Sequence, residues 1–173
     1  MRSLAPAALC LALIACAGDA PDQSDWERAQ RAQSWQESRV TLPRYPQKAN
    51  LVEFEVDARS DFHFQVDTAS LSVGSDGVVR YVLLARSSEG AQNVSFEGLR
   101  CSDGEYKIYA TGSGNGAWQE VRDPRWRPVE QGAGSWRRML ANNYFCPARA
   151  PIRTVAEGVD ALRRGGNPRA GGP

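Results

Sequence analysis

From residue 50 to residue 122 the chain alternates short β-branched, aromatic or aliphatic runs with clusters of Ser, Asp and Gly. Such runs between turn residues are typical of β-strands, and Asp-Gly tolerates the positive φ that tight hairpins need. Strands joined by short turns lie antiparallel, so we predict a meander of about five strands, preceded by two further runs. The meander strands are residues 70–74, 78–87, 92–101, 105–111 and 117–122, and the earlier runs are 51–56 and 62–66.

Two runs differ in how their alternate positions are filled. In residues 78–87 both alternating sets are apolar, with Val82 and Leu84 on one face and Tyr81 on the other, which predicts a central strand covered on both sides. In residues 105–111 one set is apolar (Tyr106, Ile108, Ala110) and the other polar (Glu105, Lys107, Thr111). This pattern predicts a strand with one solvated face.

Helical signals lie at both ends of the chain. Ser24 and Glu27 form a capping box for a helix of about a dozen residues, which we interpret as a tether, and two prolines at 43 and 46 stop it. Residues 136–140 predict a short helix, after which residues 144–147 return the chain to the sheet. A second capping box, Thr154 and Glu157, opens a helix that ends at Gly165, and residues 166–173 are predicted to be disordered.

The first residues have the features of a bacterial export signal. Arg2 is followed by an apolar run over residues 4–14 that is too short to span a bilayer, and Leu13 to Cys16 match a lipoprotein cleavage site. The competing interpretation is an ordinary cleavage after Ala17 that leaves an unanchored periplasmic protein. We expect lipidation of Cys16 and, because Ala17 rather than Asp follows it, sorting to the outer membrane. The predicted organisation is 1–15 signal, 16–41 tether and helical linker, 42–165 domain and 166–173 tail.

Charge and cysteine content narrow the function. The chain has 21 Lys and Arg against 20 Asp and Glu, and loss of Arg2 with the signal leaves 20 against 20, so we expect no nucleic-acid partner. Cys10 leaves with the signal and Cys16 is the anchor. The two remaining cysteines, Cys101 and Cys146, are predicted to form a disulfide in an oxidising compartment.

The candidate chemistry is sparse. Asp57, Asp61, His63 and Asp67 form the densest polar group, but no second His or Cys completes a metal-ligand set, so we expect no metal and no cofactor. Trp118, Trp126 and Trp136 fall in one stretch, where they either fill the core or form an exposed ligand surface for glycan or peptide. No constellation in the sequence indicates a particular reaction.

Three stretches, residues 66–81, 93–101 and 144–147, together resemble the cryptic neisserial protein-like (CNP-like) family of proteobacterial envelope proteins. The resemblance covers about residues 42–165. It implies an exported domain, frequently a lipoprotein, without an established activity, and it supplies no catalytic residue. Both cysteines of the predicted disulfide lie within these stretches.

We therefore expect one α+β domain, an antiparallel meander sheet with an N-terminal tether helix and C-terminal helices. The expected function is that of a non-catalytic binding or structural module in the periplasm, lipid-anchored to the membrane, with an envelope protein or a glycan as partner. The alternatives are a metal-dependent hydrolase that uses the Asp57 to Asp67 cluster and an assembly partner of an envelope protein.

Overall fold

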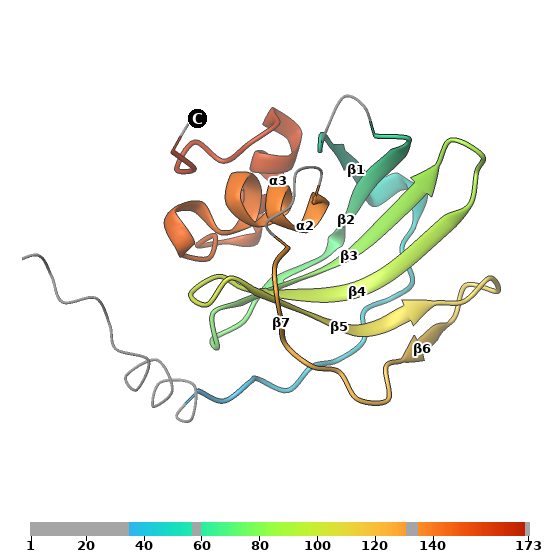
Figure 1. Ribbon diagram of the computed structural model, residues 1–173, viewed down its shortest axis with the longest axis horizontal. Coiled ribbons are helices and arrows are strands. Elements are labelled where there is room, and N and C mark those ends of the chain that lie inside the picture. Colours follow the sequence, from blue (N-terminus) through green and yellow to red (C-terminus); the bar gives the residue numbers. More distant parts are fainter. Residues whose placement is uncertain (1–34, 57–59, 131–134, 172–173) are drawn as a thin grey trace, which may run out of the picture. The chain divides into compact units, whose positions relative to one another are not determined.

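The structure is a computed structural model that describes residues 35–56, 60–130 and 135–171. Its main unit comprises Gln36–Pro173. The unit contains an antiparallel sheet in which β1 to β6 lie side by side in chain order, while β7 pairs with β5 (Figure 1). The strands are β1 (Leu51–Phe54), β2 (Phe62–Val73), β3 (Val78–Ser87), β4 (Gln92–Arg100), β5 (Glu105–Gly112), β6 (Trp118–Glu120) and β7 (Arg127–Pro128).

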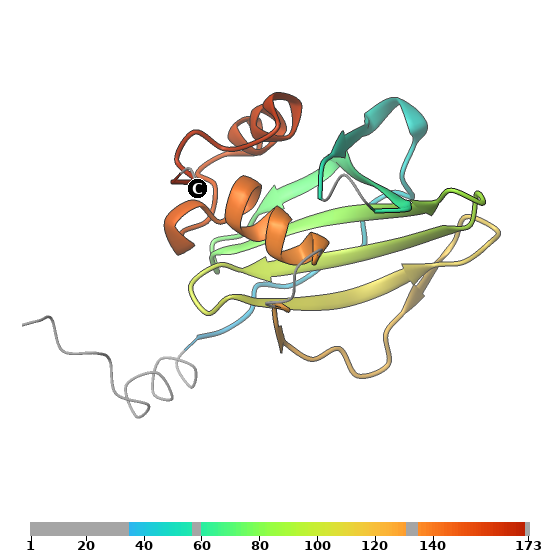
Figure 2. The ribbon, with the colours of Figure 1, turned by 45° about the horizontal axis from the view of Figure 1, so that its top comes forward.

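The predicted α+β class is confirmed, because C-terminal helices pack on one face of this sheet (Figure 2). These are α2 (Trp136–Met139), the π-helix η2 (Leu140–Phe145), the 3-10 helix η3 (Pro147–Arg149) and α3 (Val155–Arg164), and a 3-10 turn η1 (Lys48–Asn50) precedes β1. The prediction that residues 144–147 rejoin the sheet is wrong. Tyr144 and Phe145 complete η2 and reach the sheet through buried side chains alone.

Both predicted limits of the last helix are confirmed. Thr154 Oγ1 accepts a hydrogen bond from Glu157 N, while the Glu157 carboxylate accepts one from Arg153 N, one residue before the cap. The helix ends at Gly165, whose φ of 76° is open to glycine and disfavoured for other residues. The described part of the predicted disordered tail is held in place instead, because the buried Asn167 hydrogen-bonds Tyr144 O and Glu157.

The central position of β3 is confirmed. Val79, Tyr81 and Leu83 belong to the core beneath the helices, and Val82 and Leu84 belong to a second core on the opposite face. The second core is covered by residues 36–47, named here the strap, which contribute three partly buried side chains (Val40, Leu42 and Tyr45). The part of the chain that packs on the sheet therefore begins before residue 42, the residue at which the sequence predicts that the domain starts.

Two β-bulges alter what the alternation predicted. On β2, Asp67 pairs with Val82 but Ser72 pairs with Arg80. The separate runs predicted at 62–66 and 70–74 therefore belong to one bulged strand of 12 residues. Ser70 closes the gap, since its hydroxyl accepts from Val82 N at 2.8 Å and donates to Asp67 O at 2.6 Å. A side chain thus replaces a missing ladder hydrogen bond.

The bulge on β5 changes which face its residues occupy. Phe96 pairs with Ala110 and Glu97 with Ile108, so Tyr109 is the extra residue, and both Tyr109 and Ala110 join the strap-side core. The expectation that Ala110 shares a face with Tyr106 and Ile108 is therefore wrong. The strap also covers part of the face of β5 that was expected to be solvated.

Candidate functional site

The helices cover only part of their face of the sheet (Figures 1 and 2). Residues of the middle strands and of α2 line an open groove on this face. The groove has a volume of about 470 Å³, within the range of about 300 to 1,000 Å³ that is usual for small-molecule sites. Strands β2 to β5 supply its floor, and α2 supplies an end wall. Its principal lining residues are Phe62, Phe64, Leu83, Ala85, Ile108 and Trp136.

Three aromatic rings form a row in this groove. Phe62 and Phe64 are two residues apart on β2 and therefore point to the same face, where their ring centroids lie 6.2 Å apart at an interplanar angle of 30°. Phe64 stacks in turn on Trp136 of α2, at 5.8 Å and 28°. Phe62 is 45% exposed, which makes its ring the accessible end of a nearly parallel stack. A flat apolar group can extend such a stack.

A buried ion pair lies at the α2 end of the groove. Glu97 of β4 is fully buried and accepts hydrogen bonds from Arg137 Nε at 3.1 Å and Arg137 Nη2 at 3.2 Å. Ser95 Oγ donates to the same carboxylate at 2.6 Å, and Tyr81 Oη lies 3.5 Å from it. Because both carboxylate oxygens are hydrogen-bonded, the buried charge is compensated within the site.

The electrostatics of the pair follow from this geometry. Burial alone would lower the pKa of Arg137, but the neighbouring Glu97 carboxylate outweighs burial and raises it. The pKa of Tyr81 is raised well above its ordinary value of 10.0, first by burial and then by Glu97. The guanidinium also lies over the rings of Tyr106 at 4.0 Å and Trp136 at 4.1 Å. Arg137 therefore fixes the Trp136 wall against the sheet.

The described residues of the candidate metal cluster do not form a metal-binding group. His63 Nδ1 lies 2.8 Å from Glu53 Oε1 on the neighbouring strand, and its side chain is 63% exposed. Asp67 is buried in the β2 bulge, where burial raises its pKa and Ala69 N donates to it, and Asp57 lies outside the described residues. Among residues 35–56, 60–130 and 135–171, no three His, Cys, Asp or Glu side chains are grouped to hold a metal ion.

The three candidate tryptophans do not form one surface. Trp118 packs in the strap-side core, where its Nε1 donates to Pro43 O at 2.9 Å, whereas Trp136 packs on the helix-covered face. Trp126 lies over Arg100 and Lys107, at 5.2 and 5.5 Å from its ring centroid. Only Trp136 borders the groove. A glycan or envelope-protein partner stays a prediction.

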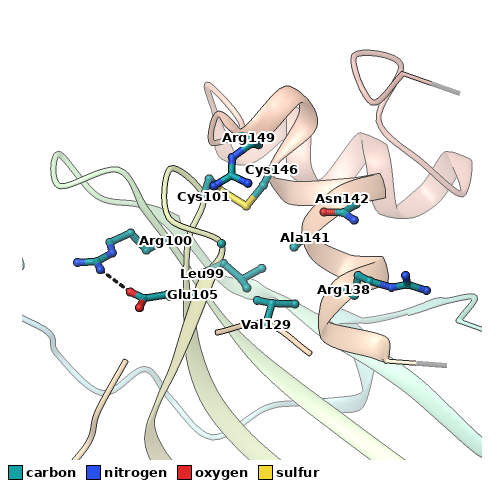
Figure 3. A pocket seen from close by; sticks show the side chains of 11 residues that line it. Leu99, Arg100, Cys101, Glu105, Val129, Arg138, Ala141, Asn142, Cys146 and Arg149 are labelled. Atoms are coloured by element: carbon teal, nitrogen blue, oxygen red, sulfur yellow. Dashed lines mark hydrogen bonds and ion pairs between the residues drawn. A yellow bond between two sulfur atoms is a disulfide. The ribbon is translucent and has the colours of Figure 1, made fainter. Parts of the chain in front are cut away.

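The predicted disulfide is present and borders a second, smaller cavity. Cys101, directly after β4, and Cys146, between η2 and η3, are bonded with their Cα atoms 5.2 Å apart. Figure 3 shows the bond above Leu99, Val129 and Ala141, with the Arg100 and Glu105 ion pair to one side. The cavity of about 180 Å³ is below the usual range for ligand sites, so we assign it to packing around the disulfide.

Sequence reasoning named Trp136 but missed the other groove residues, although part of the signal was available. Phe62 and Phe64 are alternate residues of a predicted strand and therefore lie on the same face of the sheet. To recognise the apolar floor of the groove, the later residues on that face would have had to be examined together with them. Glu97 interrupts the otherwise apolar buried pattern of β4. Nothing in the sequence indicates that its partner is Arg137, 40 residues away.

Cys16 and the predicted export signal lie outside the described residues. Within the part of the chain that is described, no helix is long and apolar enough to span a bilayer.

Comparison with known proteins gives a family but no activity. The model of the CNP1-like family matches residues 30–163, which include every residue that lines the groove. The chain is 24% identical over 140 residues to cryptic neisserial protein 1 of Neisseria gonorrhoeae, an alignment that covers 71% of this chain and 69% of that protein. No solved structure shows significant similarity to the chain.

Proposed function

Since the chain belongs to the CNP1-like family, we propose that it is a non-catalytic binding module of the cell envelope, lipid-anchored through Cys16. Its proposed ligand is a flat, apolar group that enters the groove. The observation that carries this proposal is the row of nearly parallel rings that ends at the exposed Phe62. An exposed ring at the end of a stack offers apolar area and a π-face without prior rearrangement.

The charged groups of the groove support binding rather than a reaction. Glu97 and Arg137 hold each other in a bidentate pair, so neither serves as a general base or as a free cation while the pair is intact. Breaking it would leave a buried charge uncompensated, which costs about 3 to 5 kcal/mol. The pair therefore acts as a rigid end wall, and the apolar rings provide the binding surface.

Binding is tested with the full chain and N-phenyl-naphthylamine, a flat, uncharged fluorescent probe. We expect saturable binding that Phe62→Ser weakens about tenfold, equivalent to about 1.4 kcal/mol, because one of the stacked rings is removed. Val155→Ser is the matched control, since Val155 is also an exposed large apolar side chain, at 40%, but lies on α3 away from the groove. Equal weakening by both substitutions, or by neither, would overturn the assignment of the groove.

The anchor is tested separately by mass spectrometry of the protein made in a bacterial host with a lipoprotein pathway. We expect a mature amino terminus at Cys16 that carries acyl chains, and we expect Cys16→Ser to abolish the acylated form. A mature terminus at Gly18 without acyl chains would establish the competing cleavage. In that case the groove proposal would stand and the anchor proposal would not.

A further inference from the structure

The strap, residues 36–47, contacts the sheet mainly through side chains, as a peptide bound to a receptor surface does. Figures 1 and 2 show it in blue, crossing the sheet on the face opposite the helices. Among the described residues, no backbone-to-backbone hydrogen bond joins positions 36–46 to another segment. Side-chain contacts and one side-chain to backbone bond, Ser38 N to Asp76 Oδ2 at 2.8 Å, hold its first part in place.

The main polar contact is a carboxylate site built by two strands. Glu37 accepts hydrogen bonds from Lys107 Nζ and Tyr109 Oη, both at 2.7 Å, and Arg80 Nη2 lies 3.6 Å away. The side chains of Arg80, Lys107 and Glu37 are only 7%, 13% and 19% exposed. Contacts between charges this far from solvent discriminate strongly between acidic and basic partners.

The apolar half of the strap fits the same face. Val40, Leu42 and Tyr45 pack on the core formed by β3, β4 and β5, and the Tyr45 ring lies 5.1 Å from that of Trp118. Trp118 Nε1 donates to the carbonyl of Pro43 at 2.9 Å. Pro43 and Pro46 restrict this part of the chain to extended conformations, which reduces the entropy lost when it docks.

The sheet itself shapes the surface that receives the strap. A Cβ on Gly98 would lie 2.6 Å from Tyr109 Oη, and one on Gly74 would lie 2.6 Å from Arg80 Nη1, so both glycines make room for the donors. A Cβ on Gly112 would lie 2.5 Å from Tyr45 Oη, so this glycine makes room for the strap itself. Arg80 is held in place by Asp76, whose Oδ2 lies 2.6 Å from Arg80 Nη2.

We propose that this face is a receptor for an extended acidic and apolar segment, and that the strap of a second copy of the chain occupies it, so that two copies exchange residues 36–47. The argument for a second copy is complementarity, because its strap presents the same carboxylate and apolar side chains to the same donors. Exchange would break no backbone ladder, because positions 36–46 make no backbone-to-backbone hydrogen bond with another described segment. Such exchange of an identical element is a low-cost route to a dimer.

A charge-reversal experiment separates exchange from docking within one chain. Full-length chains with two different tags are co-expressed, and capture of one tag is followed by detection of the other. Glu37→Lys puts a basic strap on an intact site, and Lys107→Glu puts an acidic site beside an intact strap. In exchanged pairs of these two variants both contacts are between opposite charges, so we expect about tenfold more mixed pairs than self-pairs of either variant.

The double variant Glu37→Lys with Lys107→Glu is the specificity control, since positions 37 and 107 again carry opposite charges within one sequence. It should pair with itself as the natural chain does and should fail to pair with the natural chain, because both mixed contacts would join like charges. Circular dichroism and the disulfide content establish that each variant is folded. Two results would contradict exchange of the strap. In the first, capture of one tag brings down none of the other, either for the natural chain or for the mixed variants. In the second, the amount brought down does not depend on charge matching.

Discussion

At the scale of single residues, the surface that receives the strap depends on positions where a side chain is missing. Gly98 and Gly112 are glycines within strands, where glycine is ordinarily unfavourable, and at each a tyrosine hydroxyl approaches to 2.5 or 2.6 Å of where a Cβ would be. The tyrosine that fills the space beside Gly112 is Tyr45, 67 residues earlier in the chain. A sequence shows the glycine but not the distant side chain that requires it, which is why this surface was not predicted.

Acid should weaken the protein at Asp76. Burial alone would raise the pKa of its carboxyl, but hydrogen bonds from Arg80, Ser38 N and Val78 N outweigh burial and lower it from 3.8 to about 2. A lowered folded-state pKa means that the stabilisation is fully present above about pH 4 and is lost as the pH falls toward 2. The loss should amount to about 2 kcal/mol, measured as the free energy of urea unfolding at each pH.

Asp76→Asn should remove this part of the pH dependence, because the amide does not titrate. Asp123→Asn is the control, since Asp123 is 66% exposed and its pair with Arg125 lies at the surface, where such pairs contribute little. An acid-induced loss that is the same size in the natural chain and in Asp76→Asn would contradict this account.

At the scale of elements, local signals predicted well what is decided locally. Turn residues located the hairpins from β3 to β5, and Thr154 and Gly165 marked the two ends of α3. Alternation failed at the bulges, where Ser70 and Tyr109 occupy positions that only the partner strand defines. The predicted return of residues 144–147 to the sheet is wrong, because a π-helix that ends at Phe145 satisfies the local backbone while Tyr144 and Phe145 fill the core with their side chains.

The disulfide should contribute strongly to the attachment of the helical layer. It links the end of β4 to the junction of η2 and η3, with 45 residues of sequence separation. In the chain-entropy model, closing a loop of this length contributes roughly 4 kcal/mol. We expect Cys101→Ala with Cys146→Ala to lose about this much in urea unfolding.

A reducing agent supplies the control for that measurement. It should destabilise the natural chain toward the value of the double variant and should leave the double variant unchanged. Two free thiols in the unfolded, non-reduced chain, or a loss below about 1 kcal/mol, would contradict the role assigned to the bond.

At the scale of the whole molecule, one sheet separates two differently built layers. The helical layer carries the groove and is fixed by a disulfide and a buried ion pair, whereas the strap layer is fixed by side-chain contacts. Strand β3 lies between them, pairs with both neighbours along its length, and is buried on both faces over its first seven residues. The two layers should therefore differ in how easily they open.

Hydrogen exchange followed by mass spectrometry measures this difference directly. Amides of β3 and of the facing part of β4 should exchange slowest, because opening them exposes both cores at once. Amides of the strap other than that of Ser38, which donates to Asp76, should exchange fastest, because they lack backbone partners among the described residues. Glu37→Gln should speed strap exchange further while leaving β3 unchanged. Equal slowing of the strap and β3 would mean that the strap opens only with global unfolding, which would leave exchange between folded copies without a path.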